Sequence, residues 1–168
     1  MGISHVSLLL WTKWRIIAVH MEQAFETLIW FLGGADVLGS RRLRNELDLD
    51  SLTHEGIPVA SLEHAIAMLG STKQSILDGV GIARSTMRRR KSGGGLRLDL
   101  VESERTIRLG RIAALGNEAL GSMNAVGHWL QESNRALGGA EPLSLLQTDA
   151  GTREVEAVLT RALYGGYS

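Results

Sequence analysis

Short segments with a helical spacing of apolar residues, separated by glycines, most constrain what this chain can fold into. The 168 residues include twenty glycines and only two prolines. Apolar side chains recur three and four residues apart, as in Phe25, Leu28, Ile29 and Leu32, and no clear strand-like alternation occurs. Glycine tolerates the positive φ that tight corners between helices need. The pattern therefore predicts an all-α fold made of short helices.

Charge and cysteine content limit the classes of protein that this sequence can encode. Lys and Arg number 18, and so do Asp and Glu, so the net charge alone does not point to nucleic acid. The basic residues nevertheless gather between 84 and 91, while the last third of the chain leans acidic. Without cysteine there is no disulfide, thiolate metal site or thiol nucleophile. This composition suits a reducing cytoplasm, where we expect the protein to act.

Residues 71–95 predict a helix-turn-helix unit that binds DNA. Ser71 and Gln74 have the spacing of a capping box for a first helix. Two glycines within residues 79–82 predict the turn, and the second helix is expected to start near Ala83, although alanine is a poor N-cap. Ile82 and Met87 are expected to form a hydrophobic staple at its start.

The second helix carries no acidic residue and ends at the three glycines 93–95. Such a helix can enter the major groove, where arginine binds guanine edges and basic charge neutralises phosphates. The alternative interpretation is a solvated basic helix of an ordinary helical domain. The residues predicted to contact DNA are Lys73, Gln74, Arg84, Ser85, Thr86, Arg88, Arg89, Arg90 and Lys91.

Start signals locate most of the remaining helices. Ser61 is the expected N-cap of a helix over residues 62–69. Asp99 and Glu102 predict the start of a long helix that reaches about residue 120. Pro142 suits the first position of a short helix, and Thr148 is the expected cap of the final one.

The long helix carries a stripe of apolar and small residues that has two interpretations. Small residues would let a second copy approach closely, and paired DNA half-sites one turn apart favour a homodimer. Alternatively, the stripe is only part of the core of one chain. Its members are Leu109, Ile112, Ala113 and Gly116.

We expect three regions: residues 1–21, residues 22–121 with the helix-turn-helix, and a C-terminal unit of residues 122–168. We expect residues 1–21 to be an extension, and Met21 is an alternative start of translation. The apolar run 6–11 is too short to span a bilayer, although Trp14 and Arg15 would suit a helix lying on a membrane surface.

The sequence does not favour an enzyme. The five histidines, which are His5, His20, His54, His64 and His128, show no metal-ligand spacing. The glycine-rich stretches do not follow strands, so a dinucleotide or phosphate loop is not expected. We therefore expect no catalytic residue, no metal and no cofactor.

Two sets of motifs in this chain resemble a known family. The stretch NRALGGAEPLSLLQTDAGTREVE, over residues 134–156, resembles the toxin-binding domain of Xre/MbcA/ParS-type antitoxins, and YGGY at 164–167 is similar to the usual end of that domain. Upstream, LGGADVLG (32–39), ELDL (46–49), EGIP (55–58) and VESER (101–105) also fit. The resemblance covers residues 30–168, and Ala83 and Glu141 depart from the usual pattern.

This resemblance implies a bacterial type II antitoxin. Such proteins bind and neutralise a RES-type toxin, an enzyme that consumes or uses NAD, and they repress their own operon by binding operator DNA, usually as dimers. No small-molecule substrate is implied. The alternative is a stand-alone helix-turn-helix repressor whose C-terminal bundle only forms dimers.

The C-terminal unit is expected to carry the toxin contact. So few short helices are not expected to bury all of their apolar side chains, and a partner would cover the surplus. Arginine and tyrosine are favoured anchors at interfaces. The residues predicted to contact the toxin are Leu143, Leu146, Glu154, Val158, Arg161, Tyr164, Gly165 and Tyr167.

Overall fold

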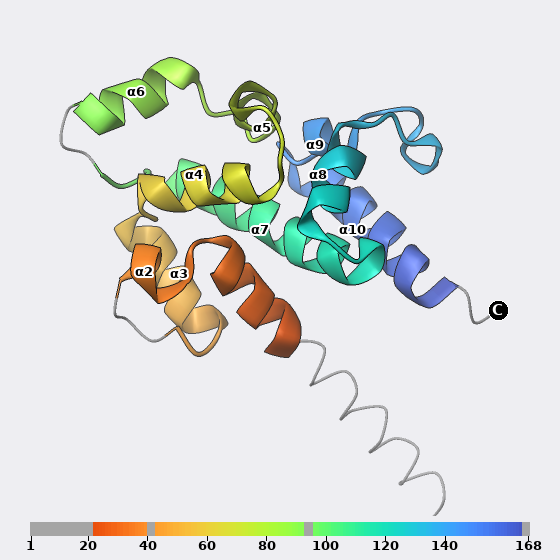
Figure 1. Ribbon diagram of the computed structural model, residues 1–168, viewed down its shortest axis with the longest axis horizontal. Coiled ribbons are helices and arrows are strands. Elements are labelled where there is room, and N and C mark those ends of the chain that lie inside the picture. The colour runs from red at the N-terminus through yellow and green to blue at the C-terminus, as the bar shows by residue number, and fades with distance from the viewer. Residues whose placement is uncertain (1–21, 40–42, 93–95, 166–168) are drawn as a thin grey trace, which may run out of the picture.

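The computed structural model describes residues 22–39, 43–92 and 96–165, and every regular element in these ranges is a helix (Figure 1). The all-α prediction is therefore confirmed. The sequence interpretations of residues 1–21 concern a segment outside the described residues. After a helix over residues 22–31 come α2 (Gly34–Leu38), α3 (Glu46–Glu55), α4 (Val59–Met68), α5 (Lys73–Gly79), α6 (Arg84–Ser92), α7 (Leu100–Leu120), α8 (Met123–Gln131), the 3-10 helix η1 (Arg135–Leu137), α9 (Pro142–Leu145) and α10 (Asp149–Tyr164).

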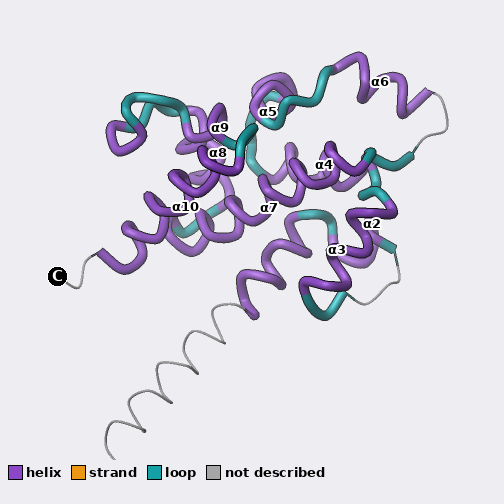
Figure 2. The backbone as a smooth tube through the Cα atoms, turned by 180° about the vertical axis from the view of Figure 1, so that it is seen from behind, coloured by secondary structure: helices purple, strands orange, loops and turns teal. Residues whose placement is uncertain are grey.

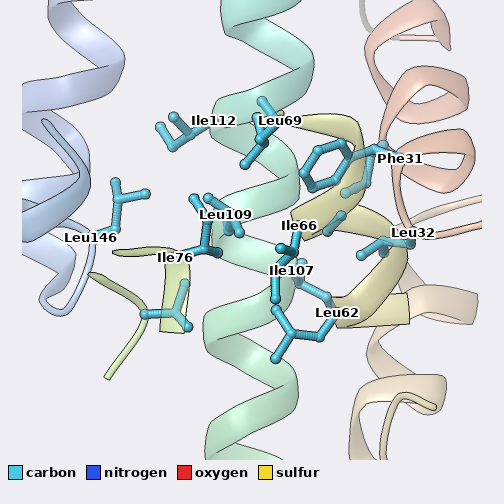
Figure 3. Close-up of a cluster of buried hydrophobic side chains, with 14 of the residues drawn as sticks. Phe31, Leu32, Leu62, Ile66, Leu69, Ile76, Ile107, Leu109, Ile112 and Leu146 are labelled. Carbon is cyan, nitrogen blue, oxygen red and sulfur yellow. The ribbon is translucent and has the colours of Figure 1, made fainter. Parts of the chain in front are cut away.

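Helix α7 runs through the middle of the molecule, and both the front and back views show helices on either side of it (Figures 1 and 2). It packs against α3 on one side and against α8 and α10 on the other. Figure 3 shows Leu109 and Ile112 of α7 between Leu69, which directly follows α4, and Leu146. One continuous apolar core therefore joins the helix-turn-helix half to the C-terminal half.

The start of α7 follows the sequence prediction. The Asp99 carboxylate accepts a hydrogen bond of 2.9 Å from the backbone N–H of Glu102, and the Glu102 carboxylate accepts one of 2.8 Å from the N–H of Asp99. This reciprocal pair satisfies two backbone donors that a helix start leaves open. Thr148 likewise caps α10, and Pro142 lies in the first turn of α9, as predicted.

Two predicted caps are wrong. Helix α4 starts at Val59, after Pro58, so Ser61 lies inside the helix with its side chain fully buried. Helix α5 is capped by Thr72, whose hydroxyl accepts from the N–H of Ser75, and not by Ser71. The Ser71 hydroxyl instead donates to the carbonyl of Leu69 at 3.2 Å. In both helices the N-cap position is occupied by another nearby residue, which is Pro58 in α4 and Thr72 in α5.

The stripe on α7 belongs to the core of this chain. Leu109, Ile112 and Ala113 have no exposed surface, and Gly116 is buried beside Val126 of α8. The interpretation of this stripe as a dimer interface is therefore wrong, because helices of the same chain already cover it. A homodimer stays a prediction, and it would have to use another surface.

Small residues let the C-terminal half approach the helix-turn-helix half closely. A Cβ at Gly127 of α8 would overlap the backbone carbonyl of Leu69, at the end of α4. Next to it, the Gln131 amide donates to the Ser71 hydroxyl at 2.6 Å and to the Gly127 carbonyl at 2.8 Å. A Cβ at Gly79 of α5 would overlap the side chain of Leu143 of α9.

Replacement of Gly127 tests this close approach. In an isolated helix, alanine is favoured over glycine by about 1 kcal/mol. Overlap with backbone atoms costs about 2–3 kcal/mol, because a carbonyl cannot rotate away as a side chain can. We therefore expect Gly127→Ala to lower the free energy of unfolding, measured by urea denaturation. Gly165→Ala is the matched control, since its φ of −73° suits any residue and nothing lies within 4 Å. An equal effect of the two variants would contradict the packing described.

Candidate nucleic-acid interface and partner-binding surface

Helices α5 and α6 form the predicted helix-turn-helix. Gly81, with φ of +67°, provides the left-handed residue that the corner requires. The backbone N–H of Ile82 donates to the carbonyl of Leu77 at 2.8 Å and so closes the turn. Ile82 and Met87 are both buried, in agreement with the predicted staple. These contacts point one face of α6 into the core and leave the opposite face exposed.

The exposed face of α6 is strongly basic. Arg84, Ser85, Arg88 and Arg89 are exposed, and Thr86 is half-buried. Within the described residues, Arg84, Arg88 and Arg89 form no ion pair. Their guanidinium groups are therefore available to phosphates and base edges, which is the chemistry that a recognition helix uses.

A hollow of about 590 Å³ lies beside this face, and it brings together residues of both helices of the unit. Its lining residues are Lys73, Arg84, Met87, Arg88 and Ser92. Polar groups of α6 and the start of α5 thus border one surface, as a groove-binding unit requires.

Several residues predicted to contact DNA are engaged elsewhere. Lys73 pairs with Glu63 at 3.1 Å, and the Gln74 amide donates to Asp78 of the same helix. Arg90 pairs with both Asp99 and Glu102, at 2.8 Å and 2.7 Å. The side chain of Lys91 lies outside the described residues. Of the residues predicted to contact DNA, the structure therefore places Arg84, Ser85, Arg88 and Arg89 together on the exposed face of α6, whereas Arg90 is held by α7.

The C-terminal surface is the exposed side of α10. Glu154, Arg161 and Gly165 are exposed, and 53% of Tyr164 is accessible to solvent. Val158 is half-buried, and Tyr167 lies outside the described residues. Sequence reasoning did not select Arg153, Ala157 and Thr160, which are exposed on the same helix. Their spacing from one another by four, three and seven residues, which places them on one side of a helix, was the signal that would have identified them.

The prediction that the C-terminal unit leaves apolar side chains exposed for a partner is wrong for most of these side chains. Leu143 is 3% exposed and Leu146 is 1% exposed, so neither is available to a partner as the chain stands. Val155 and Leu159 are equally buried. The reason is that this unit does not fold against itself alone: α9 packs on α5 and α8, and α10 packs along α7.

The NRALGG stretch forms the loop between α8 and α9. The Asn134 side chain accepts from the backbone N–H of Ala136 at 2.9 Å and caps η1. Gly138 and Gly139 both have positive φ, and the N–H of Gly139 returns to the carbonyl of Asn134 at 2.9 Å. These residues therefore have a structural role in shaping the loop.

A groove of about 690 Å³ separates α3, α7 and α10. Among its lining residues, Arg111 of α7 pairs with Glu46 of α3 at 2.5 Å, and Arg108 pairs with Asp149 of α10. Across the ranges that the structure describes, no three His, Cys, Asp or Glu side chains form a group that could hold a metal ion. In the same ranges no helix is long and apolar enough to cross a membrane.

Comparison with protein families matches both halves of the chain. Residues 48–111 match the antitoxin Xre-like helix-turn-helix domain, and residues 115–165 match the antitoxin Xre/MbcA/ParS C-terminal toxin-binding domain. A helix-turn-helix domain followed by a toxin-binding domain defines the protein as an antitoxin, a regulatory class. The chain belongs to the Xre-type antitoxin family. No curated protein matches the sequence.

Truncation of Leu143 tests its reassignment from a partner contact to the core. Removal of a buried leucine side chain beyond Cβ costs about 3 kcal/mol, because it leaves a cavity as well as losing apolar burial. We expect Leu143→Ala to lower the free energy of unfolding by this amount in urea. Thr160→Ala, on the exposed side of α10, should change it by no more than about 0.5 kcal/mol. A near-neutral Leu143→Ala would mean that the side chain is exposed in solution.

Proposed function

We propose that this chain neutralises a RES-type toxin, an enzyme that consumes NAD, and represses its own operon by binding operator DNA. The observation that carries the proposal is the separation of two exposed polar surfaces on one core. Figure 1 shows α6 and α10 at opposite ends of the molecule. One surface can therefore contact DNA while the other contacts a protein.

The DNA-binding part of the proposal depends on α6. Three arginines on its exposed face are free of ion pairs within the described chain, and Ser85 adds a small polar group among them. Arginine binds guanine through two hydrogen bonds, and any arginine near a phosphate releases counterions. Two copies on a two-fold symmetric operator would double these contacts, so a homodimer fits the proposal.

The toxin-binding part depends on the exposed side of α10 and the match of residues 115–165 to the toxin-binding domain. Arg161 and Tyr164 stand one turn apart near the end of α10. Both residue types are enriched among side chains that dominate interface energies. We propose that they anchor the toxin, together with Glu154, which lies about two turns before Arg161 on the same helix. A toxin that consumes NAD acts in the cytoplasm, where operator DNA is also found.

Replacement of Arg88 and Arg89 by alanine tests the DNA-binding surface. Loss of two phosphate contacts should lower the slope of log K against log salt concentration by about 1.8 in magnitude, at about 0.9 per contact. The measurement is a fluorescence-anisotropy titration of the operator upstream of the gene at several salt concentrations. Arg153→Ala, an exposed arginine on α10, is the control. Operator affinity that is unaffected by the Arg88 and Arg89 changes would contradict the role of α6.

Shortening of the chain tests the toxin-binding surface. A chain that ends at Leu163 lacks Tyr164 and the residues after it, while the buried Val155 and Leu159 stay in place. We expect this chain to fold and to bind operator DNA as the full chain does, but to rescue growth poorly when the neighbouring toxin gene is expressed. The Arg88 and Arg89 variant should show the opposite pattern, with full rescue. Rescue by the shortened chain equal to that of the full chain would place the toxin contact elsewhere on α10.

A further inference from the structure

Arg90 differs from the other arginines of α6 in its surroundings. It is the last arginine of the helix, and its guanidinium group turns toward the start of α7. One guanidinium nitrogen lies 2.8 Å from the Asp99 carboxylate and 2.7 Å from the Glu102 carboxylate. Another donates to the backbone carbonyl of Arg97 at 3.2 Å. Three acceptors from one short stretch therefore hold one side chain.

Burial supports the same distinction. The Arg90 side chain is 21% exposed, and Nε is buried with no acceptor in the described part of the chain. Its partner Glu102 is 8% exposed. A phosphate would have to compete with two carboxylates that are already in place, and Glu102 would then be left buried and unpaired, which is strongly unfavourable. Arg90 is therefore unsuited to phosphate binding, in contrast to Arg88 and Arg89.

The acceptors of Arg90 are themselves fixed. Asp99 and Glu102 form the capping box that begins α7. The backbone just before it is bridged to the segment between α3 and α4, with hydrogen bonds of 2.8 Å from Val59 to Leu96 and from Leu98 to Ile57. The Ser103 hydroxyl of α7 also accepts from the N–H of Ile57 at 3.0 Å. Because the start of α7 is fixed in this way, the ion pairs of Arg90 connect α6 to the rigid part of the molecule.

A second arginine holds the other end of α6. Arg105 of α7 donates to the carbonyl of Gly81, in the turn before α6, at 2.7 Å. Helix α6 is thus tied to α7 near its start by Arg105 and near its end by Arg90. The buried Met87 lies between these two attachments. No other residue of α6 is apolar, so Met87 is the one apolar side chain of this helix that anchors it in the core.

We propose that Arg90 is a positioning residue, which fixes the angle at which α6 presents Arg84, Arg88 and Arg89 to DNA. This inference rests on the proposed DNA-binding function and refines it, because it removes one arginine from the contact surface. The positive charge of Arg90 is already paired with the carboxylates of Asp99 and Glu102. Its loss should therefore weaken operator binding without reducing the number of counterions released.

The first experiment compares Arg90→Gln with Arg88→Gln by operator titration at several salt concentrations. We expect Arg88→Gln to lower the salt slope by about 0.9 in magnitude. Arg90→Gln should lower affinity by about tenfold, the equivalent of about 1.4 kcal/mol, and leave the slope unchanged. Arg90→Lys should recover part of the affinity, because one ammonium group can still pair with the carboxylates. A slope lowered equally by Arg90→Gln and Arg88→Gln would overturn the inference.

The second experiment is a double-mutant cycle with Glu102→Gln. Glutamine can still accept the hydrogen bond from the N–H of Asp99, so the capping box survives while the charge is lost. If Arg90 acts through Glu102, combining Arg90→Gln with Glu102→Gln should cost less than the product of the two separate losses in operator affinity. Strictly multiplicative losses would overturn the inference.

Hydrogen exchange separates this inference from the proposed function, because it needs no DNA. In Arg90→Gln, the amides of residues 84–92 should exchange faster than in the original chain, while those of α8 stay unchanged. Unchanged exchange in α6 would overturn the positioning role. Faster exchange in a chain that binds no operator DNA at all would support the attachment of α6 and reject the proposed DNA-binding function.

Discussion

Burial of α7 on several sides is the constraint on which the rest of the structure depends. Leu109 and Ile112 contribute to a core that is shared by the helix-turn-helix half and the C-terminal half. Each half is small, and a small unit buries a smaller share of its surface than a large one, so the shared core increases the burial available to both halves. Both matched family domains reach into α7, so the boundary between them lies within a continuous helix. Both candidate surfaces are therefore mounted on one core.

The arginines divide into two groups by what they contact. Arg90, Arg105 and Arg108 donate to carboxylates or backbone carbonyls of distant elements and fasten helices to one another. Arg84 and Arg88 have no such partner among the described residues and face outward. The formal net charge of zero does not reveal this division. The capacity of a surface to bind an anionic partner depends on which arginines lack an acidic partner, and not on the total number of arginines.

Helices were predictable from the sequence where the signal was periodic and local. The apolar spacing of α7 and the Asp99–Glu102 pair identified its start and its end. Local capping patterns failed where several hydroxyl residues compete, so that Thr72 caps α5 in place of Ser71. Phe31 was missed because Phe25, Leu28, Ile29 and Leu32 already satisfied the expected spacing, yet Phe31 is fully buried.

The surfaces were less predictable, because they depend on contacts between distant residues. Leu143 and Leu146 looked like surplus when the C-terminal unit was considered alone, but α5 and α8 cover α9. Arg90 looked like one more member of a basic run, and its acceptors lie nine and twelve residues later, beyond the glycines. A local pattern identifies the charge of a residue, whereas its partner is set by the fold.

The contact between Gly79 and Leu143 has a consequence for how such antitoxins can diversify. A bulky leucine of the C-terminal unit occupies space that any side chain at position 79 would fill, and the Gln147 amide donates to the carbonyl of Asp78 beside it at 3.0 Å. Recombination that joins this helix-turn-helix to a foreign C-terminal unit would disrupt the packing of position 79 against position 143, unless the residues at both positions were exchanged together. Under the proposal that the outer side of α10 contacts the toxin, a change of toxin specificity is therefore more accessible through substitutions there than through exchange of whole units.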